Sequence, residues 1–179
     1  MLIVVTGGSP SGKSKTAERM AEKLCPSGKI YLATMFAGDG ECRDRIERHR
    51  KRREGKKYRT IERGTNLQGL NLNQKTTVLL DDLSNLVANE MYDPLGVKEG
   101  VALYAVEGIL HVMRQSKHLV VVANDVFSER VKYEESAHYL KILGEVQKQL
   151  AKEADIFIET VYGIDICHKG IRQYEEVLQ

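Results

Sequence analysis

The chain has 179 residues, 42% of them hydrophobic, with 27 lysines and arginines against 25 aspartates and glutamates. This length suits one α/β domain, so we expect a single domain over residues 1–179. The mean hydropathy is -0.36, and no stretch approaches the roughly 18 consecutive apolar residues of a membrane span. A membrane-spanning protein is therefore excluded.

The start of the chain and the cysteines predict a cytoplasmic protein. The apolar run after Met1 has neither the basic flank nor the cleavage site of a signal peptide. Cys25, Cys42 and Cys167 are an odd number at wide spacings. They match neither a disulfide framework nor a CxxC metal site, so we expect reduced thiols.

Five short apolar runs predict buried strands. They are rich in β-branched residues and do not alternate with polar ones, as expected of strands covered on both faces. A turn at Tyr162-Gly163 predicts a final hairpin over 155–168 that adds edge strands. The five runs lie at residues 2–6, 29–33, 77–81, 118–123 and 155–161.

Apolar residues at helical spacing lie between these runs. Such stripes extend from Ala17 to Leu24, from Ala102 to Met113 and, more weakly, from Ala137 to Leu150. Strands that alternate with helices predict a mostly parallel sheet between two helical layers, with right-handed crossovers. The expected fold class is therefore an α/β three-layer sandwich with a C-terminal edge hairpin.

The segment after the first run has the pattern of a phosphate-binding loop. It fits G-x-x-x-x-G-K-[ST] between a predicted strand and an amphipathic helix. Glycines let backbone amides converge on phosphate oxygens, Lys13 would bridge the β- and γ-phosphates, and the Ser14 hydroxyl would bind Mg²⁺. A glycine-rich turn with a solvated lysine is the alternative, and we expect Lys13 to be exposed without nucleotide. The expected phosphate-binding residues are Gly7, Gly8, Ser9, Pro10, Ser11, Gly12, Lys13 and Ser14.

Two adjacent carboxylates end the third run. In a P-loop NTPase-like fold, a carboxylate at this position holds Mg²⁺ together with the loop, and we assign this role to Asp81. An acid after a strand can instead cap the following helix, which begins near Ser84. Asp82 is the expected cap.

The segment from Arg43 to Arg63 concentrates positive charge. It holds eleven lysines and arginines against four acids, a local charge of +7, so the rest of the chain carries about -5. Such a segment attracts the phosphates of a nucleotide or a nucleic acid. Between Arg43 and Arg53 only Ile46 is aliphatic, so we expect an exposed basic helical arm over about residues 41–57. On composition alone, a solvated charged surface that includes His49 is the more ordinary interpretation.

Short motifs extend the phosphate-loop pattern over most of the chain. The first is VTGG-x-x-SGKS, and the most specific is the array Asp39, Glu41, Arg45-Ile46 and His49. In these motifs the chain resembles the bifunctional adenosylcobinamide kinase/adenosylcobinamide-phosphate guanylyltransferases of cobalamin biosynthesis. The other matching motifs are Tyr31-Leu32-Ala33-Thr34, Arg53, Thr60 with Glu62, Leu80-Asp81, Asn89, Asn124-Asp125-Val126, Gly144, Leu150-Ala151 and Gly163-Ile164.

The resemblance implies a two-step enzyme. A nucleoside triphosphate, GTP or ATP, phosphorylates the corrinoid adenosylcobinamide; GTP then guanylylates His49, and GMP passes to adenosylcobinamide phosphate. A neutral imidazole is a competent nucleophile for this transfer. The resemblance also implies a homo-oligomer, expected to be a trimer. The implied catalytic residues are His49 and Lys13, the nucleotide contacts beyond the loop are Ala33, Thr34, Arg53, Glu62 and Asp81, and the Mg²⁺ ligands are Ser14 and Asp81.

Two alternatives stay open. A divergent P-loop small-molecule kinase would leave His49 idle, and a nucleic-acid-binding or regulatory NTPase would place the basic segment on a phosphate backbone. Only Tyr58 in that segment could stack on bases. The isoelectric point of about 8.4 also lies below the range of such domains. We therefore expect no nucleic-acid partner.

Overall fold

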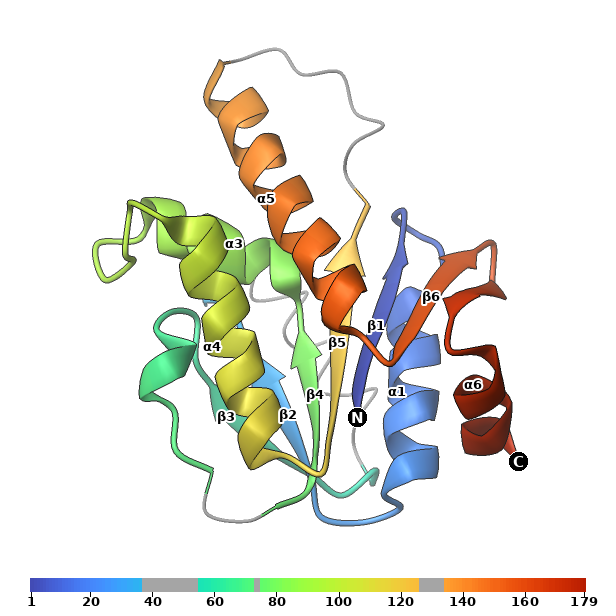
Figure 1. Ribbon diagram of the computed structural model, residues 1–179. Coiled ribbons are helices and arrows are strands. Elements are labelled where there is room, and N and C mark those ends of the chain that lie inside the picture. Colours follow the sequence, from blue (N-terminus) through green and yellow to red (C-terminus); the bar gives the residue numbers. More distant parts are fainter. Residues whose placement is uncertain (37–54, 73–74, 126–133) are drawn as a thin grey trace.

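A seven-stranded sheet organises the computed structural model, which describes residues 1–36, 55–72, 75–125 and 134–179 (Figure 1). The strand order is β3-β2-β4-β5-β1-β6-β7. Only the β6–β7 pair is antiparallel, and the other five neighbouring pairs are parallel. The strands are β1 (Leu2–Gly7), β2 (Lys29–Ala33), β3 (Tyr58–Glu62), β4 (Thr77–Asp81), β5 (His118–Asn124), β6 (Ile156–Val161) and β7 (Ile164–Lys169).

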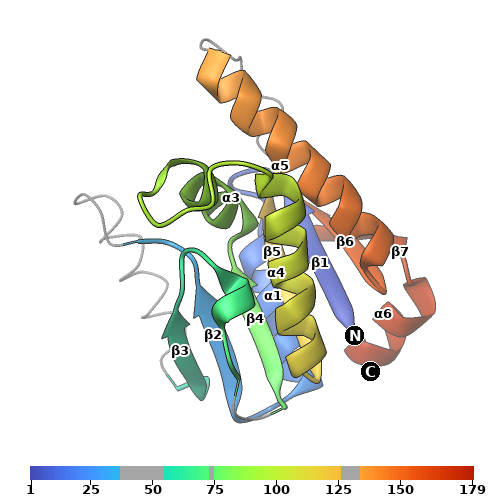
Figure 2. The same ribbon diagram turned by 60° about the vertical axis from the view of Figure 1, so that its left-hand side comes forward.

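Helices cover both faces of this sheet, as Figure 2 shows from a second direction. One layer holds α1 (Lys13–Leu24) and α6 (Ile171–Leu178). The other holds α3 (Leu83–Tyr92), α4 (Val101–Gln115) and α5 (Glu134–Glu153), with the short 3-10 helix η1 (Leu67–Gly69) against α4. The predicted three-layer α/β sandwich with a C-terminal hairpin is confirmed. Among the helices in the described ranges, none has the length and apolar character needed to cross a bilayer.

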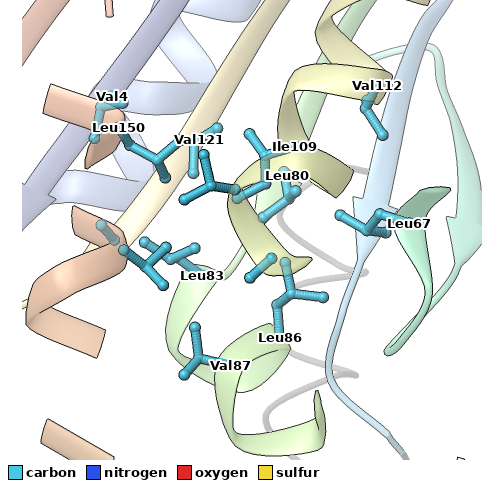
Figure 3. Close-up of a cluster of buried hydrophobic side chains, with 14 of the residues drawn as sticks. Val4, Leu67, Leu80, Leu83, Leu86, Val87, Ile109, Val112, Val121 and Leu150 are labelled. Atoms are coloured by element: carbon cyan, nitrogen blue, oxygen red, sulfur yellow. The ribbon is translucent and has the colours of Figure 1, made fainter. Parts of the chain in front are cut away.

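Central strands are buried on both faces, which explains their continuous apolar sequences. Val4, Leu80 and Val121 point into the layer of α3, α4 and α5, where they meet Ile109 and Leu150 (Figure 3). Alternate strand residues such as Ile3 and Val5 join a second cluster under α1. Full burial of each large aliphatic side chain contributes about 1.5–3 kcal/mol to folding.

The expected basic arm does not continue as a helix to residue 57. Gly55 and Lys57 have positive φ values of 79° and 57°, which end any helix before the arm's predicted last residue. Residues 55–57 lead into β3, an edge strand that the apolar runs did not predict. The remainder of the expected arm, within 37–54, lies outside the described residues.

A lysine is buried at the start of β2. The Lys29 side chain is 1% exposed; its Nζ donates to the Pro26 carbonyl at 3.1 Å and lies 4.9 Å from the centre of the Tyr58 ring. Its ammonium thus keeps a hydrogen-bond acceptor and a cation–π contact in place of water. Through Tyr58 this contact joins β2 to the edge strand β3.

Candidate active site

The parallel strands bring the predicted site residues to one edge of the sheet. Strand register places Asp81 beside Ala33, and Ala33 beside Glu62. It also pairs Gly7, where the phosphate loop begins, with Asn124 at the end of β5. The carboxyl edge of a parallel sheet is where α/β proteins bind their ligands. The chain therefore gathers its phosphate loop and its candidate metal carboxylate on the side expected for a nucleotide.

Glycine is required at both ends of the loop's turn. A Cβ atom on Gly7 would lie 2.4 Å from the Thr160 carbonyl oxygen, a distance that no side chain tolerates. Gly12 has φ 98° and is the N-cap of α1, so the helix begins directly at Lys13. The backbone amides and positive dipole end of α1 consequently face the loop, an arrangement suited to phosphate.

Lys13 is buried within the loop, and the expectation that it would be exposed is wrong. The side chain is 7% exposed, and its Nζ donates to the Gly8 carbonyl at 3.1 Å. The loop wraps around the ammonium, so a backbone carbonyl takes the place of water as acceptor. Lys13 is thereby held at the centre of the turn.

Asp81 is oriented by a tyrosine from the neighbouring strand. The Tyr31 hydroxyl donates to Asp81 Oδ2 at 2.8 Å, and Asp81 itself is half-buried. Ser14, in the first turn of α1, is half-buried as well. Carboxylate and hydroxyl oxygens suit Mg²⁺, which usually takes one or two protein carboxylates together with substrate phosphates and water. Within the described ranges there is no group of three His, Cys, Asp or Glu residues that could hold a metal, so a site completed by phosphate is the kind that fits.

Asp82 is the helix cap, as expected, and it also joins three strands. Its side chain is buried; Oδ1 accepts from the Asn85 amide at 2.8 Å and Oδ2 from Asn124 Nδ2 at 3.0 Å. The Thr34 hydroxyl donates to the Asp82 carbonyl at 2.7 Å and accepts from its amide at 2.8 Å. The ends of β2, β4 and β5 are thus tied together beside Asp81.

Two amide side chains extend this connection. Asn89 Nδ2 donates to the carbonyls of Thr34 and Gly64, at 2.8 Å and 3.1 Å. Gln147 Nε2 donates to the Asn124 carbonyl at 2.9 Å, which joins α5 to β5. Asn89 and Asn124 are among the motif residues, and the structure gives both a supporting role that the motif alone did not indicate.

A second buried aspartate, Asp165 on β7, fixes the hairpin to the phosphate-loop helix. It accepts hydrogen bonds from Thr16 of α1 at 2.8 Å, and from Thr160 and Tyr174 at 3.0 Å each. It also forms an ion pair with Arg19. Burial, and then the hydrogen bond to Asp165, raise the pKa of Tyr174. No sequence signal indicated this cluster, because Thr16 and Arg19 lie 149 and 146 residues away along the chain.

The remaining predicted residues are distributed around the same edge or lie outside the description. Ala33 is half-buried at the end of β2, Thr34 is buried, and Glu62 is exposed at the end of β3. His49 and Arg53 fall within 37–54 and lie outside the described residues.

Lys56 connects the chain that follows His49 to the phosphate-loop helix. Its Nζ lies 2.6 Å from Glu18 Oε2 and 3.0 Å from Glu22 Oε1. Glu18 is buried on α1, so the ion pair holds residue 56 against the helix that begins at Lys13.

The family model and the curated relatives agree on one family. Residues 3–167 match the family model of cobinamide kinase / cobinamide phosphate guanyltransferase. The bifunctional adenosylcobalamin biosynthesis protein CobU of Escherichia coli K12 is 33% identical over 181 residues, covering 93% of this chain and 98% of that protein. The Salmonella typhimurium CobU is 29% identical over the same shares.

Among solved structures, the flagellar accessory protein FlaH of Methanocaldococcus jannaschii aligns with a TM-score of 0.44 and 15% identity, over 94% of this chain and 77% of that one. The family match, in contrast, includes both the phosphate loop and the basic segment. On this match over residues 3–167, the chain belongs to the cobinamide kinase/cobinamide phosphate guanyltransferase family of cobalamin biosynthesis.

Proposed function

We propose that one nucleotide site, at the carboxyl edge of the sheet, serves both activities of this cobinamide kinase/cobinamide phosphate guanyltransferase. The observation that carries the proposal is the phosphate loop closed around Lys13, on the same sheet edge as the oriented carboxylate of Asp81. In this proposal the acceptors are adenosylcobinamide and then its phosphate.

The loop would bind the β- and γ-phosphates of the nucleoside triphosphate. Backbone amides of the loop, Pro10 excepted because it has no N–H, would donate to phosphate oxygens, and Lys13 Nζ would exchange the Gly8 carbonyl for them. Ser14 and Asp81 would hold Mg²⁺, which when bound neutralises charge on these phosphates. Tyr31 supports this assignment, since its hydroxyl fixes one carboxylate oxygen of Asp81.

For the kinase step, the loop positions the γ-phosphorus for attack by the alcohol of adenosylcobinamide. A bond forms between the alcohol oxygen and the γ-phosphorus, and the bond to the β–γ bridging oxygen breaks. The nucleoside diphosphate leaves, and the alcohol proton passes to solvent. This reaction depends mainly on positioning and charge stabilisation, which Lys13 and the α1 amides can supply.

For the guanylyl step, His49 would attack the α-phosphorus of GTP. A nitrogen–phosphorus bond forms, pyrophosphate leaves and the imidazole proton is released. A phosphate oxygen of adenosylcobinamide phosphate then attacks the same phosphorus, and the nitrogen–phosphorus bond breaks. Support comes from the motif position of His49 and from neighbouring arginines, Arg53 included, which would stabilise phosphate charge.

Ala33 and Glu62 would contact the nucleotide from the β2–β3 side of the edge. Ala33 ends β2 beside Asp81, and Glu62 ends β3 beside Ala33. Thr34 would hold this edge through its two hydrogen bonds with the Asp82 backbone. The homo-oligomer, expected as a trimer, is also part of the proposal, and light scattering in solution tests it.

The experiment that tests the proposal is incubation with GTP labelled at the α-phosphate, followed by mapping of the labelled residue. We expect a protein-bound GMP that is labile to acid and stable to alkali, as a phosphoramidate is. His49→Ala should abolish this adduct and keep much of the kinase activity. The matched control is His138→Ala, which removes an exposed histidine of α5 and should leave the adduct intact.

Two outcomes would contradict the guanylyl step. One is an adduct that persists in His49→Ala, and the other is no adduct in the unmodified protein under conditions where GTP binds. Either would favour the divergent P-loop small-molecule kinase.

A further inference from the structure

The tip of the β6–β7 hairpin touches the phosphate loop. The Gly163 amide donates to the Ser11 carbonyl at 2.8 Å. A Cβ atom on Gly12 would lie 3.5 Å from Gly163 Cα and 3.7 Å from Thr160 Cγ2, in ordinary van der Waals contact. The hairpin therefore packs directly on the backbone that would hold the phosphates, and whatever its tip carries is a neighbour of the bound nucleotide.

That tip carries a tyrosine in a conformation that tyrosine rarely adopts. Tyr162 has φ 50° and Gly163 has φ 82°, the pair of positive values found in tight hairpin turns. Asn, Asp or Gly is preferred at the first of these positions, since a bulky residue with positive φ is strained. The Tyr162 side chain is 91% exposed, so burial of its ring within the fold does not offset this strain. Strain of this kind is characteristic of functional positions.

The sheet order places this tyrosine on the side of the loop away from Asp81. Strand β1, which leads into the loop, has β5 and β4 on one side and β6 and β7 on the other (Figure 2). Asp81 ends β4, and a metal held there as proposed would draw the terminal phosphates toward that side. The opposite end of the nucleotide, with its ribose and base, then extends toward the β6–β7 hairpin.

The hairpin is also held rigidly. Asp165 ties β7 to Thr16 and Arg19 of the phosphate-loop helix. The backbone that carries Tyr162 is thereby fixed beside the phosphate loop. A purine base stacks on an aromatic ring through its face, so the contact does not depend on the hydrogen-bonding groups at the edge of the base.

We propose that Tyr162 is the stacking platform for the purine base of the nucleoside triphosphate held in the phosphate loop. This inference rests on the proposed nucleotide site. Because stacking uses the face of the ring, the platform accepts both GTP and ATP.

The test compares dissociation constants of GTP, ATP and inorganic tripolyphosphate, measured by calorimetry with Mg²⁺ on the full chain. The variant is Tyr162→Asn, since asparagine suits the turn and folding is favoured. We expect GTP and ATP to bind about tenfold more weakly, a loss within the range known for base–aromatic stacking. Tripolyphosphate, which has no base, should bind as before. Tyr162→Phe keeps the aromatic ring and should bind GTP as tightly as the unmodified protein.

The matched control is Ile166→Ala, which removes an exposed apolar side chain further along the same hairpin and should bind GTP normally. A spectroscopic readout is available because the chain has eight tyrosines and no tryptophan. GTP should quench tyrosine emission in the unmodified protein and quench it less in Tyr162→Asn.

Normal GTP affinity in Tyr162→Asn, or an equal loss of GTP and tripolyphosphate, would overturn the stacking proposal. If Lys13→Ala meanwhile no longer binds tripolyphosphate, the phosphate-loop site is supported and only the stacking role of Tyr162 is wrong. If the unmodified protein binds neither GTP nor tripolyphosphate, the nucleotide site itself is wrong.

Discussion

On the β5 side of the phosphate loop, Asp82 accepts hydrogen bonds from neutral amides of Asn85 and Asn124 and lies among the central strands. On the β6 side, Asp165 accepts from three hydroxyl groups and pairs with the charged Arg19. The first aspartate is built into the core of the sheet, whereas the second attaches a C-terminal hairpin to α1. The comparison predicts that the side of Asp82 contributes more to the stability of the whole fold, and that loss of the Asp165 contacts loosens the hairpin without unfolding the domain.

The largest expected effect lies between the two sides. Lys13→Ala removes the ammonium at the centre of the loop, so phosphoryl transfer should fall by about a thousandfold, as when a key electrostatic group is lost. Both sides should stay folded, because the Lys13 ammonium donates to a carbonyl of its own loop. Steady-state kinetics and thermal unfolding check this pair of outcomes. Near-normal turnover would show that residues 7–14 do not form the phosphate-binding part of the active site.

Asp82→Ala tests the core side. It removes a helix cap and an acceptor for Asn124, so the free energy of unfolding should fall by about 3 kcal/mol. Urea unfolding measures the change. Asp82→Asn keeps one acceptor oxygen and should lose about half as much. A loss in Asp82→Ala no greater than that of a surface substitution would break the comparison.

Asp81→Asn separates ligand binding from support at two adjacent carboxylates. It keeps the side-chain volume, so stability should change little, while activity should fall by roughly a hundredfold and the Mg²⁺ concentration for half-maximal rate should rise. Activity measured across a Mg²⁺ titration provides the evidence. An unchanged Mg²⁺ dependence would show that Asp81 does not hold the metal.

Asp165→Ala tests the attached side. Loss of its partners should lower the free energy of unfolding by about 1.5 kcal/mol, less than the loss in Asp82→Ala, because Arg19 is half exposed and can return to water. GTP should bind more weakly, since the hairpin that carries Tyr162 loosens, while tripolyphosphate binding should change less. Equal stability losses at Asp82 and Asp165 would mean that both sides are parts of one core.

The smallest effect concerns Tyr139, which donates to the Ser84 carbonyl at 3.1 Å near Asp82. Burial, and then the Asp82 charge, raise the pKa of Tyr139 to about 12. Its usual value is about 10, so its contribution to stability is complete below pH ~10 and is lost as the pH rises toward ~12. Urea unfolding at pH 8 and 11 should show a smaller alkaline loss in Tyr139→Phe, by about 1 kcal/mol once the partial exposure of the side chain is discounted. An identical pH dependence in both proteins would show that Tyr139 does not cause the alkaline loss of stability.

Most of the fold could be predicted because its central strands are buried on both faces and therefore have continuous apolar sequences. β3 escaped this signal because only Tyr58 and Ile61 of its five residues are partly buried, so its sequence does not differ from a polar loop. The short helix α6 has an apolar stripe of Ile171, Tyr174, Val177 and Leu178, but it is only eight residues long, has no buried residue and was not among the helices predicted from the sequence.

Local chemistry decides how much of the site could be predicted. The strand–turn–helix context of the phosphate loop and the Asp82 cap depend on residues within a few positions, and both agree with the structure. That the loop binds phosphate stays a prediction. The burial of Lys13 depends on how the loop wraps, and the Asp165 cluster depends on contacts between distant segments. Residue spacing along the chain predicts neither the conformation of a loop nor contacts between distant segments. The family prediction is confirmed, while His49 stays a prediction that labelling must decide.

The buried Lys29 can report local opening of the sheet at its β3 edge. Its ammonium lies under Tyr58 of β3 and is 1% exposed, so an amine-acylating reagent reaches it only when β3 separates from β2. Edge strands open at lower free energy than central ones. The acylation rate of this one lysine, followed by mass spectrometry as nucleotide is added, would therefore report whether ligand at the opposite end of β2 restrains the edge on which β3 lies.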